Sequence, residues 1–397
     1  MERIAVVGIG RIGLCLALNL ERAGYEVLGC DRNREHVRRV ARRILRTPEP
    51  GVEEALGNAR AFRACDAIGE VRDFGPALIL VAVATPEAEG GGYDPVEVDR
   101  VLGELFALGP APRRMELALV CTTLPGYGDS RALEAEARGY FLSYNPGFVA
   151  QGSVIRDQLY PDGVLIGEAD ATAGDALERM HRRMCLNEPT VHRMSRLSAE
   201  IAKLATNSFL TMKIAFANAI GDLATRVGAE PERVLAAVGA DARIGPECLR
   251  YGFSYGGPCF PRDNRALNLF ARRNDCELLQ AEATDEMNRR HAAFQVGHYL
   301  RAHAEAEAIH FHSVTYKPGT EILDESAPLA LAVQLARAGR RVVVHESPAV
   351  LARLRDEFGA LFEYHTRPAK ADLPAHGSGS RARPVRPRRR SLKSLEK

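Results

Sequence analysis

In the first half of the chain, short runs of apolar residues alternate with longer segments in which apolar and polar residues follow a helical period. Between short apolar runs lie segments with helical spacing of apolar residues, for example at Leu14–Ala23 and Glu97–Leu108. The apolar runs are typical of buried parallel strands and cover Ile4–Val7, Glu26–Gly29, Leu78–Val83 and Leu117–Cys121. This order predicts an α/β domain of the Rossmann type, with a doubly wound parallel sheet, over residues 1–190.

The pattern becomes almost entirely helical over residues 195–304. Its longest uninterrupted segment, Ala199–Val227, is amphipathic and predicts a spine that joins the two ends of the molecule. Strand–helix alternation returns at Ala308 with a short strand and a helix at Pro328–Ala338. A further strand follows at Arg341–His345.

After His345 the alternation fades, which predicts a truncated or degenerate α/β domain over residues 308–370. Residues 371–397 are rich in Arg, Ser, Pro and Gly, so we expect a basic, disordered tail. Arginine runs without aromatic residues are usually solvated, and nucleic-acid binding is therefore not favoured.

Composition narrows the class of protein. The 397 residues carry a formal net charge of only +2, which argues against nucleic acid or a membrane surface as the main partner. No run of about 18 apolar residues is present, and the first apolar run enters a glycine turn instead of a cleavage site. The eight cysteines form no CxxC pair and no zinc-type cluster. We therefore expect a cytoplasmic protein with reduced thiols and no metal site.

The N-terminus carries a candidate dinucleotide site. A strand leads into Gly8-x-Gly10-x-x-Gly13, a helix follows, and a second strand ends at Asp31. Gly8 permits a tight turn, Gly10 lets the backbone approach a pyrophosphate, and Gly13 lets helix and strand pack closely. The Asp31 carboxylate can accept from a ribose 2′-hydroxyl and would repel a 2′-phosphate, so NAD is favoured over NADP. Arg32 weakens that preference slightly. A plain glycine turn is the alternative, but all the parts occur in register.

Two later segments carry candidate chemistry. In EIAKLATN, Lys203 and Asn207 are four residues apart and share a helix face, where they could hold a hydroxyl and stabilise negative charge. An ordinary solvated face is the alternative, and the segment taken alone favours it.

The second segment is GGPCFPRD. Gly256 and Gly257 would let substrate approach the backbone, and Pro261 suits a first helical turn, which places Cys259 at a helix N-terminus. Asp263 follows one turn later on the same side. The polar, glycine-rich setting favours a nucleophile over a buried structural cysteine.

In chain order these segments resemble the UDP-glucose/GDP-mannose dehydrogenase family over residues 1–345. The matching motifs are GIGRIG, VATP (Val83–Pro86), TTLPG (Thr122–Gly126), NPGFVAQG (Asn145–Gly152), EIAKLATN, DARIG (Asp241–Gly245), YGGPCFPRD and TYKPGT (Thr315–Thr320). The resemblance implies an NAD domain, a long-helix dimerisation domain and a domain that binds the sugar nucleotide. It also implies oxidation of the C6 alcohol of a UDP-glucose-like substrate to a uronate with two NAD, as in polysaccharide biosynthesis.

The resemblance also implies roles for individual residues. Cys259 would capture the aldehyde as a thiohemiacetal that becomes a thioester. Lys203, Asn207 and Asp263 would position the hydroxyl and water, and Thr123 would assist near the nicotinamide. Thr85 is assigned to the cofactor site. The residues assigned to the substrate are Phe148, Arg243 (reaching into the partner subunit), Gly256, Gly257 and Lys317.

Three positions depart from the family pattern. The family motif NPEFLREG is replaced by NPGFVAQG, so Gly147 and Gln151 stand where glutamates associated with water activation are expected. Losing a positioned general base costs about 10²–10⁴ in rate, so thioester hydrolysis is the step most exposed. Asp324 stands where a phosphate-compatible arginine is expected.

These departures keep other hypotheses open. The enzyme could stop at the aldehyde or pass the thioester to an acceptor other than water. The chain could also be a non-catalytic homologue that binds nucleotide sugars. A β-hydroxyacid dehydrogenase shares the Rossmann domain and a Lys-x-x-x-Asn helix, but it leaves Cys259 unexplained.

Overall fold

The computed structural model describes residues 1–367. An eight-stranded sheet organises the N-terminal half in the order β3-β2-β1-β4-β5-β6-β7-β8. All neighbouring strands run parallel except β6 and β7, which are antiparallel. The strands are β1 Arg3–Val7, β2 Glu26–Cys30, β3 Phe62–Cys65, β4 Leu78–Val81, β5 Met115–Leu119, β6 Tyr140–Tyr144, β7 Gly163–Glu168 and β8 Thr190–Ser195.

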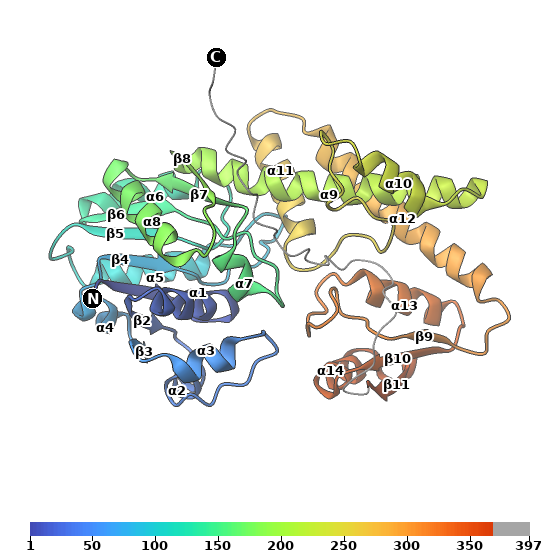
Figure 1. Cartoon of the computed structure of the whole chain (residues 1–397), viewed down its shortest axis with the longest axis horizontal. Helices are drawn as coiled ribbons and strands as arrows, with labels where there is room; N and C mark the ends of the chain where they lie inside the picture. The colour runs from blue at the N-terminus through green and yellow to red at the C-terminus, as the bar shows by residue number, and fades with distance from the viewer. Residues whose placement is uncertain (368–397) are drawn as a thin grey trace, which may run out of the picture.

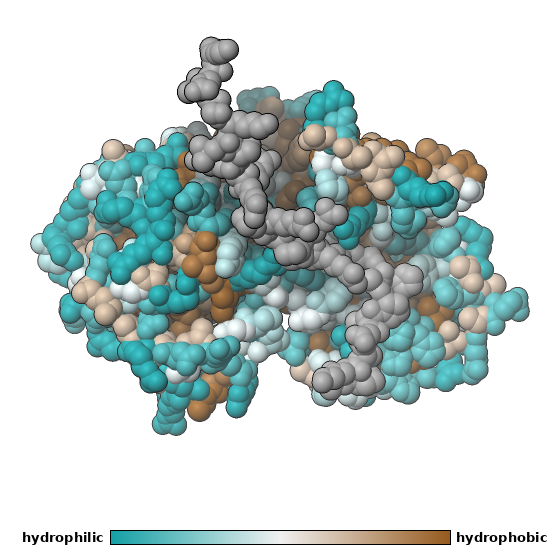
Figure 2. All heavy atoms as spheres, in the orientation of Figure 1, coloured by the Kyte–Doolittle hydropathy of each residue, from teal (hydrophilic) through white to brown (hydrophobic). Residues whose placement is uncertain are grey.

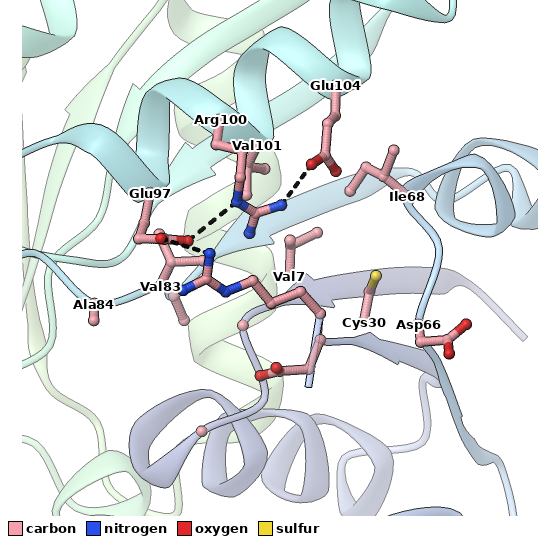
Figure 3. A pocket seen from close by; sticks show the side chains of 15 residues that line it. Val7, Cys30, Asp66, Ile68, Val83, Ala84, Glu97, Arg100, Val101 and Glu104 are labelled. Carbon is pink, nitrogen blue, oxygen red and sulfur yellow. Dashed lines mark hydrogen bonds and ion pairs between the residues drawn. The ribbon is translucent and has the colours of Figure 1, made fainter. Parts of the chain in front are cut away.

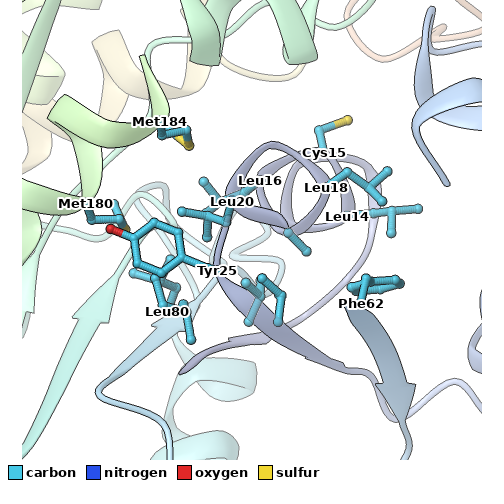
Figure 4. Packing of buried hydrophobic residues seen from close by; sticks show 14 of the residues in the cluster. Leu14, Cys15, Leu16, Leu18, Leu20, Tyr25, Phe62, Leu80, Met180 and Met184 are labelled. Atoms are coloured by element: carbon cyan, nitrogen blue, oxygen red, sulfur yellow. The ribbon is translucent and has the colours of Figure 1, made fainter. Parts of the chain in front are cut away.

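Helices cover both faces of this sheet, as a buried parallel sheet requires. They are α1 Arg11–Arg22, α2 Arg34–Ala41, α3 Val52–Asn58, α4 Ile68–Phe74, α5 Val96–Ala107, α6 Tyr127–Ala137, α7 Val154–Leu159 and α8 Ala171–Met184. Figure 4 shows α1 in the core of one face, where Leu14, Leu16 and Leu20 lie among Tyr25, Phe62, Leu80 and Met180. Residues 13–20 of α1 are all buried, so the helix packs closely against the sheet.

A helical layer begins where the sheet ends. The helix α9 (Arg196–Val227) starts at Ser195, whose side chain accepts from the backbone of Ser198, and ends at Gly228 in the left-handed conformation. The helices α11 (Phe260–Arg273) and α12 (Leu279–Ala302) pack along it, as does the short helix α10 (Pro231–Gly239). In Figure 1, α9 runs from the large sheet across the top of the molecule.

The C-terminal segment forms a second parallel sheet of three strands in the order β11-β10-β9. Its elements are β9 Ile309–Phe311, α13 Ala327–Arg337, β10 Val342–Glu346, α14 Pro348–Phe358, the 3₁₀ turn η1 Gly359–Leu361 and β11 Glu363–Thr366. The expectation that alternation fades after His345 is wrong, because a helix and a strand follow. Ser347 caps α14, and Val350, Leu351 and Leu354 pack into the core of this domain.

The four predicted strands of the large sheet are present within two residues of their expected ends, and β3, β6, β7 and β8 were not anticipated. All eight cysteines are unpaired, and five of them are buried. In the part of the chain that the structure describes, no helix is long and apolar enough to cross a membrane. The predicted basic tail lies outside the described residues.

Candidate active site

A cleft opens at the carboxyl ends of β1, β2 and β4. Its volume is about 240 Å³, and its lining includes Gly8, Gly10, Asp31, Asp66 and Ala82. Ligands of open parallel sheets bind at this edge, where the strand order reverses. Figure 3 shows Glu97, Arg100 and Glu104 of α5 above the strand ends that carry Cys30 and Asp66.

Glycine suits each of the three positions of the first turn for a different physical reason. Gly8 has φ +91°, and a Cβ there would lie 2.7 Å from the carbonyl oxygen of Ala82. At Gly13 a Cβ would lie 1.8 Å from the carbonyl oxygen of Gly8, so only glycine lets the helix start this close to the strand. At Gly10 nothing lies within 4 Å of a Cβ, which leaves open space beside the N-terminus of α1. The residues present therefore fit a pyrophosphate at this turn.

Charge at the ribose end of the cleft is balanced locally. One oxygen of Asp31 accepts from the backbone N–H of Asn33 at 2.9 Å. The neighbouring Arg32 forms an ion pair with Glu97 at 2.8 Å. Because Arg32 is already paired, it offsets the preference of Asp31 for a ribose 2′-hydroxyl less than the sequence suggests.

Thr123 and Glu200 connect the large sheet to α9. Glu200 is fully buried and accepts from the Thr123 hydroxyl at 3.0 Å. It also accepts from the backbone N–H groups of Gly126 at 2.6 Å and Gly128 at 2.9 Å. Burial raises the pKa of Glu200, while these three donors favour its charged form. Thr123 is therefore held in a fixed position beside the start of α9.

Lys203 and Asn207 lie on the buried side of α9, each only 6% exposed. The interpretation of this face as solvated is therefore wrong. The ammonium of Lys203 donates to the carbonyl of Gly147 at 3.1 Å and lies 4.4 Å from the ring centre of Phe148. Burial lowers the pKa of Lys203 to about 8, and the charge of Cys259 acts in the opposite direction. The structure thus brings together residues from α9, the loop after β6 and the start of α11.

Cys259 is the N-cap residue of α11 and is exposed, as the GGPCFPRD motif predicts. Asp263 follows one turn later, and its backbone N–H donates to the Cys259 carbonyl at 2.8 Å. The Asp263 carboxylate accepts from Asn207 Nδ2 at 2.6 Å and from the hydroxyl of Tyr93. Burial raises the pKa of Asp263 to about 8. A thiol, an ammonium, an amide and a buried carboxyl thus surround one junction beside the dinucleotide cleft.

Gly256 and Gly257 contact the C-terminal segment. A Cβ on Gly256 would lie 2.1 Å from the carbonyl oxygen of Glu325, and one on Gly257 would lie 2.4 Å from the ring of Tyr316. Gly257 also has φ +81°. The structure therefore gives these glycines a packing reason, different from the expected approach of substrate to the backbone.

The departing positions Gly147 and Gln151 lie on the loop after β6. The side-chain oxygen of Gln151 accepts from Arg11 at 2.9 Å, and its carbonyl accepts from Lys317 Nζ at 3.3 Å. Glu49 clamps the same loop by accepting from the backbone N–H groups of Gly152 and Val154, both at 2.7 Å. Lys317 thus links the C-terminal segment to the loop after β6.

Two predicted positions have exposed side chains. Arg243 follows α10, its side chain is 89% exposed, and it forms an ion pair with Asp241 at 2.7 Å. Asp324 is exposed on the loop before α13. Neither belongs to the cluster around Cys259 within this chain.

Sequence reasoning missed four residues of the site. Tyr93 and Glu200 bond directly to predicted residues, Arg262 donates to the carbonyl of Thr85 at 3.0 Å, and Glu49 holds the loop after β6. Glu200 begins the EIAKLATN motif, so its spacing from Lys203 could have been noticed. Tyr93, Arg262 and Glu49 act across long distances in sequence, which no local pattern reveals.

Two domain models of one known protein family match this chain, and the boundary between them lies where the large sheet ends and the helical layer begins. The NAD-binding domain of the UDP-glucose/GDP-mannose dehydrogenase family matches residues 2–185, and the central domain of that family matches residues 197–290. The chain belongs to the UDP-glucose/GDP-mannose dehydrogenase family. The recognition made from eight motifs is thus confirmed. The NAD-binding domain makes NAD the cofactor.

Individual relatives cover most of the chain. UDP-glucose 6-dehydrogenase from Pseudomonas aeruginosa is 31% identical over 363 residues, covering 87% of this chain and 79% of that protein. GDP-mannose 6-dehydrogenase from the same organism is 27% identical over 380 residues, covering 91% of this chain and 84% of that protein. A solved UDP-glucose dehydrogenase from Pyrobaculum islandicum has a TM-score of 0.82 at 30% identity, covering 92% of this chain and 86% of that chain. The family therefore acts on nucleotide sugars, and the β-hydroxyacid alternative loses its support.

Proposed function

We propose that this protein oxidises the C6 alcohol of a UDP-glucose-like nucleotide sugar to the uronate, with Cys259 as the nucleophile. The observation that carries the proposal is the meeting of Cys259, Lys203, Asn207 and Asp263 at one junction. They come from two helices that adjoin the NAD cleft. A helix that served only for packing would have no reason to bury a lysine and an amide beside an exposed thiol.

Each side chain has a task that matches its environment. Lys203 and Asn207 hold the sugar hydroxyl and stabilise the negative charge that develops on its oxygen. Because Lys203 is buried, its ammonium acts in a site of low dielectric constant, where such stabilisation is stronger than in water. NAD, when bound in the cleft, supplies the hydride acceptor for both oxidations. Thr123, held by Glu200, lies at the sheet edge that faces this junction.

Cys259 divides the second oxidation into two simpler steps. Its sulfur adds to the aldehyde carbon while the thiol proton passes to the carbonyl oxygen, which gives a thiohemiacetal. Loss of a second hydride together with the hydroxyl proton then gives a thioester. Water then breaks the carbon–sulfur bond, releases the carboxylate and returns the thiol. Exposure of Cys259 at the N-terminus of α11 supports this role, since a substrate can reach the sulfur there.

Hydrolysis is the slow step in this proposal. Gly147 offers no carboxylate, and the amide of Gln151 is bonded to Arg11. The carboxylate of Glu49 is occupied by two backbone N–H groups. Because a positioned general base contributes about 10²–10⁴ in rate, we expect the thioester to accumulate on Cys259.

We also propose that two copies of the chain pair along α9. Phe209, Phe216 and Leu223 are seven residues apart and are 56%, 43% and 57% exposed, which makes an apolar stripe on one side of the helix. Figure 2 shows apolar residues gathered over the far ends of α9 and α10. Lys213 on α9 anchors the loop that carries Arg243 by donating to the carbonyl of Ile244 at 3.0 Å. In a pair of chains, Arg243 would therefore be available to the nucleotide sugar bound by the other copy.

The test uses purified protein with NAD and either UDP-glucose or GDP-mannose, followed by NADH absorbance. We expect NADH from UDP-glucose, loss of turnover in Cys259→Ser, and wild-type turnover in Cys276→Ser. Cys276 is the matched control because it is the other exposed cysteine and follows the C-terminal end of α11, away from Cys259 at its start. Absence of NADH with every nucleotide hexose, despite measurable NAD binding, would favour a non-catalytic protein that binds nucleotide sugars.

A further inference from the structure

The loop between β4 and α5 places a tyrosine inside the site. Tyr93 is only 6% exposed, and its hydroxyl donates to Oδ1 of Asp263. Its ring packs with Leu204 of α9 and Leu267 of α11. The guanidinium of Arg262 lies over the same ring, 4.8 Å from its centre. The phenol is therefore fixed on several sides, and its hydroxyl meets a residue of the proposed machinery.

The loop itself is fastened to α11 and has little freedom to withdraw. Arg262 donates to the carbonyl of Thr85 at 3.0 Å, and Arg265 forms an ion pair with Glu87 at 3.0 Å. Glu87 and Tyr93 form an antiparallel bridge across the loop. Gly92, with φ +85°, passes so close to α11 that a Cβ would lie 3.1 Å from Leu269. These contacts hold the hydroxyl of Tyr93 against Asp263 before any substrate arrives.

Both oxygens of the Asp263 carboxylate are engaged by side chains. Oδ1 accepts from Tyr93, and Oδ2 accepts from Nδ2 of Asn207 at 2.6 Å. The second bond fixes the orientation of the Asn207 amide, which cannot turn over without placing its oxygen against the carboxylate. Tyr93, Asp263 and Asn207 thus form one chain of hydrogen bonds that ends at a group proposed to hold the sugar hydroxyl.

We propose that Tyr93 is a positioning residue of the oxidation site, whose hydroxyl holds Asp263 so that the Asn207 amide stays oriented toward the substrate. This inference rests on the proposed function, and it extends it to a residue that no sequence motif singled out. The ring of Tyr93 contributes packing, whereas the hydroxyl contributes orientation and favours the ionised form of Asp263.

Loss of the Tyr93 hydroxyl should change the pKa of Asp263 in a direction that can be derived and measured. Burial raises the pKa of Asp263 to about 8, and a hydroxyl that donates to a carboxylate favours its charged form. Removing that donor therefore raises the pKa further. A hydrogen bond to a charged group is strong enough to shift the pKa by about one unit. The titratable or charged groups on the elements packed around Asp263 include Lys203 and Glu200 of α9, Cys259 at the N-cap of α11, Arg262 and Arg265 of α11, Glu87 of the β4–α5 loop, and Asp285 of α12, which bonds Asn264.

The experiment compares Tyr93→Phe with Tyr251→Phe. Tyr251 is the matched control because its hydroxyl donates to another carboxylate, Asp222, at 2.9 Å, in the helical layer outside the site. The pKa of Asp263 is read from carboxyl ¹³C resonances, assigned with Asp263→Asn, in the full-length protein. The pH profile of kcat/KM for UDP-glucose is recorded beside it.

Tyr93→Phe is expected to raise the pKa of Asp263 by about one unit and to move the pH profile in the same direction. Tyr251→Phe is expected to leave both unchanged. Incorporation of 3-fluorotyrosine at position 93, which keeps the ring and strengthens the donor, is expected to lower the Asp263 pKa. It serves as the second variant if the phenylalanine protein does not fold.

An Asp263 titration unchanged by both substitutions at position 93 would overturn the inference. An equal shift of that titration in Tyr251→Phe would overturn it as well. The resonance titration does not require turnover. A wild-type protein inactive on every nucleotide sugar would therefore count against the proposed function, while the titration still decides on Tyr93.

Discussion

Replacing Asp263 by asparagine should change how the stability of the protein depends on pH. The carboxyl is 2% exposed, and burial raises its pKa from 3.8 to about 8. Between these two values the folded protein binds a proton that the unfolded chain has released. The contribution of Asp263 to stability is therefore complete below pH 3.8 and is lost as pH rises toward about 8.

The size of the effect follows from the width of this window. One unit of pH corresponds to about 1.4 kcal/mol, so the contribution of Asp263 falls by about 4 kcal/mol between pH 5 and pH 8. That loss is a large part of the roughly 5–15 kcal/mol that stabilises a typical domain. Asparagine has nearly the same shape, can accept from Asn207 and can donate to the Tyr93 oxygen, so it fills the site without titrating.

The assay is urea unfolding of wild type and Asp263→Asn at pH 5 to 9, followed by far-ultraviolet circular dichroism because the chain has no tryptophan. The variant should gain on the wild type as pH rises and level off near pH 8. A difference in unfolding free energy that stays constant across this range would refute the assignment of Asp263 as a buried carboxyl with a raised pKa.

Three further changes have separate outcomes. Gly10→Ala should leave thermal stability unchanged, because a Cβ at this position has open space. Calorimetry should nevertheless show an NAD affinity lowered by at least about tenfold, because the pyrophosphate needs that space. Glu200→Gln should cost about 2–3 kcal/mol in urea unfolding, since an amide nitrogen would face donors that now meet a carboxylate; an unchanged midpoint would contradict this. Light scattering should give a mass of twice 43.4 kDa for the wild type and of 43.4 kDa for Phe216→Ser. A wild-type protein that is monomeric would contradict the pairing proposal.

The N-terminal fold could be predicted because its physical causes are local. Gly8 has a positive φ, Gly13 lies too close to the Gly8 carbonyl to carry a Cβ, and the buried strands β1 and β4 consist almost entirely of apolar residues. The strand β8 was missed because its residues are only partly buried and alternate with polar ones. The segment just after His345 was misjudged because the polar strand β11 shows no apolar run and the buried residues of α14 lie on only one side of the helix, against a small sheet.

The candidate site could be predicted only in part. Helical spacing gives the relation of Lys203 to Asn207, and the Cys259 motif gives the start of α11. Burial of that helix face depends on α11 packing against α9, which spacing alone does not reveal. Tyr93 is separated from Asp263 by 170 residues, so its bond could be found only once the fold was known.

The most direct test of the account is the amount and time course of NADH formed per UDP-glucose, with enzyme at substrate-level concentration and NAD in excess. The account predicts two NADH per sugar, formed in a burst that is followed by a slow phase limited by hydrolysis of the thioester. It also predicts an increase in protein mass from a thioester on Cys259, which Cys259→Ser lacks. One NADH per sugar with free aldehyde would contradict it, and so would two NADH formed at a single steady rate with no adduct. The first result would remove the thioester from the pathway, and the second would show that Gly147 and Gln151 do not slow hydrolysis.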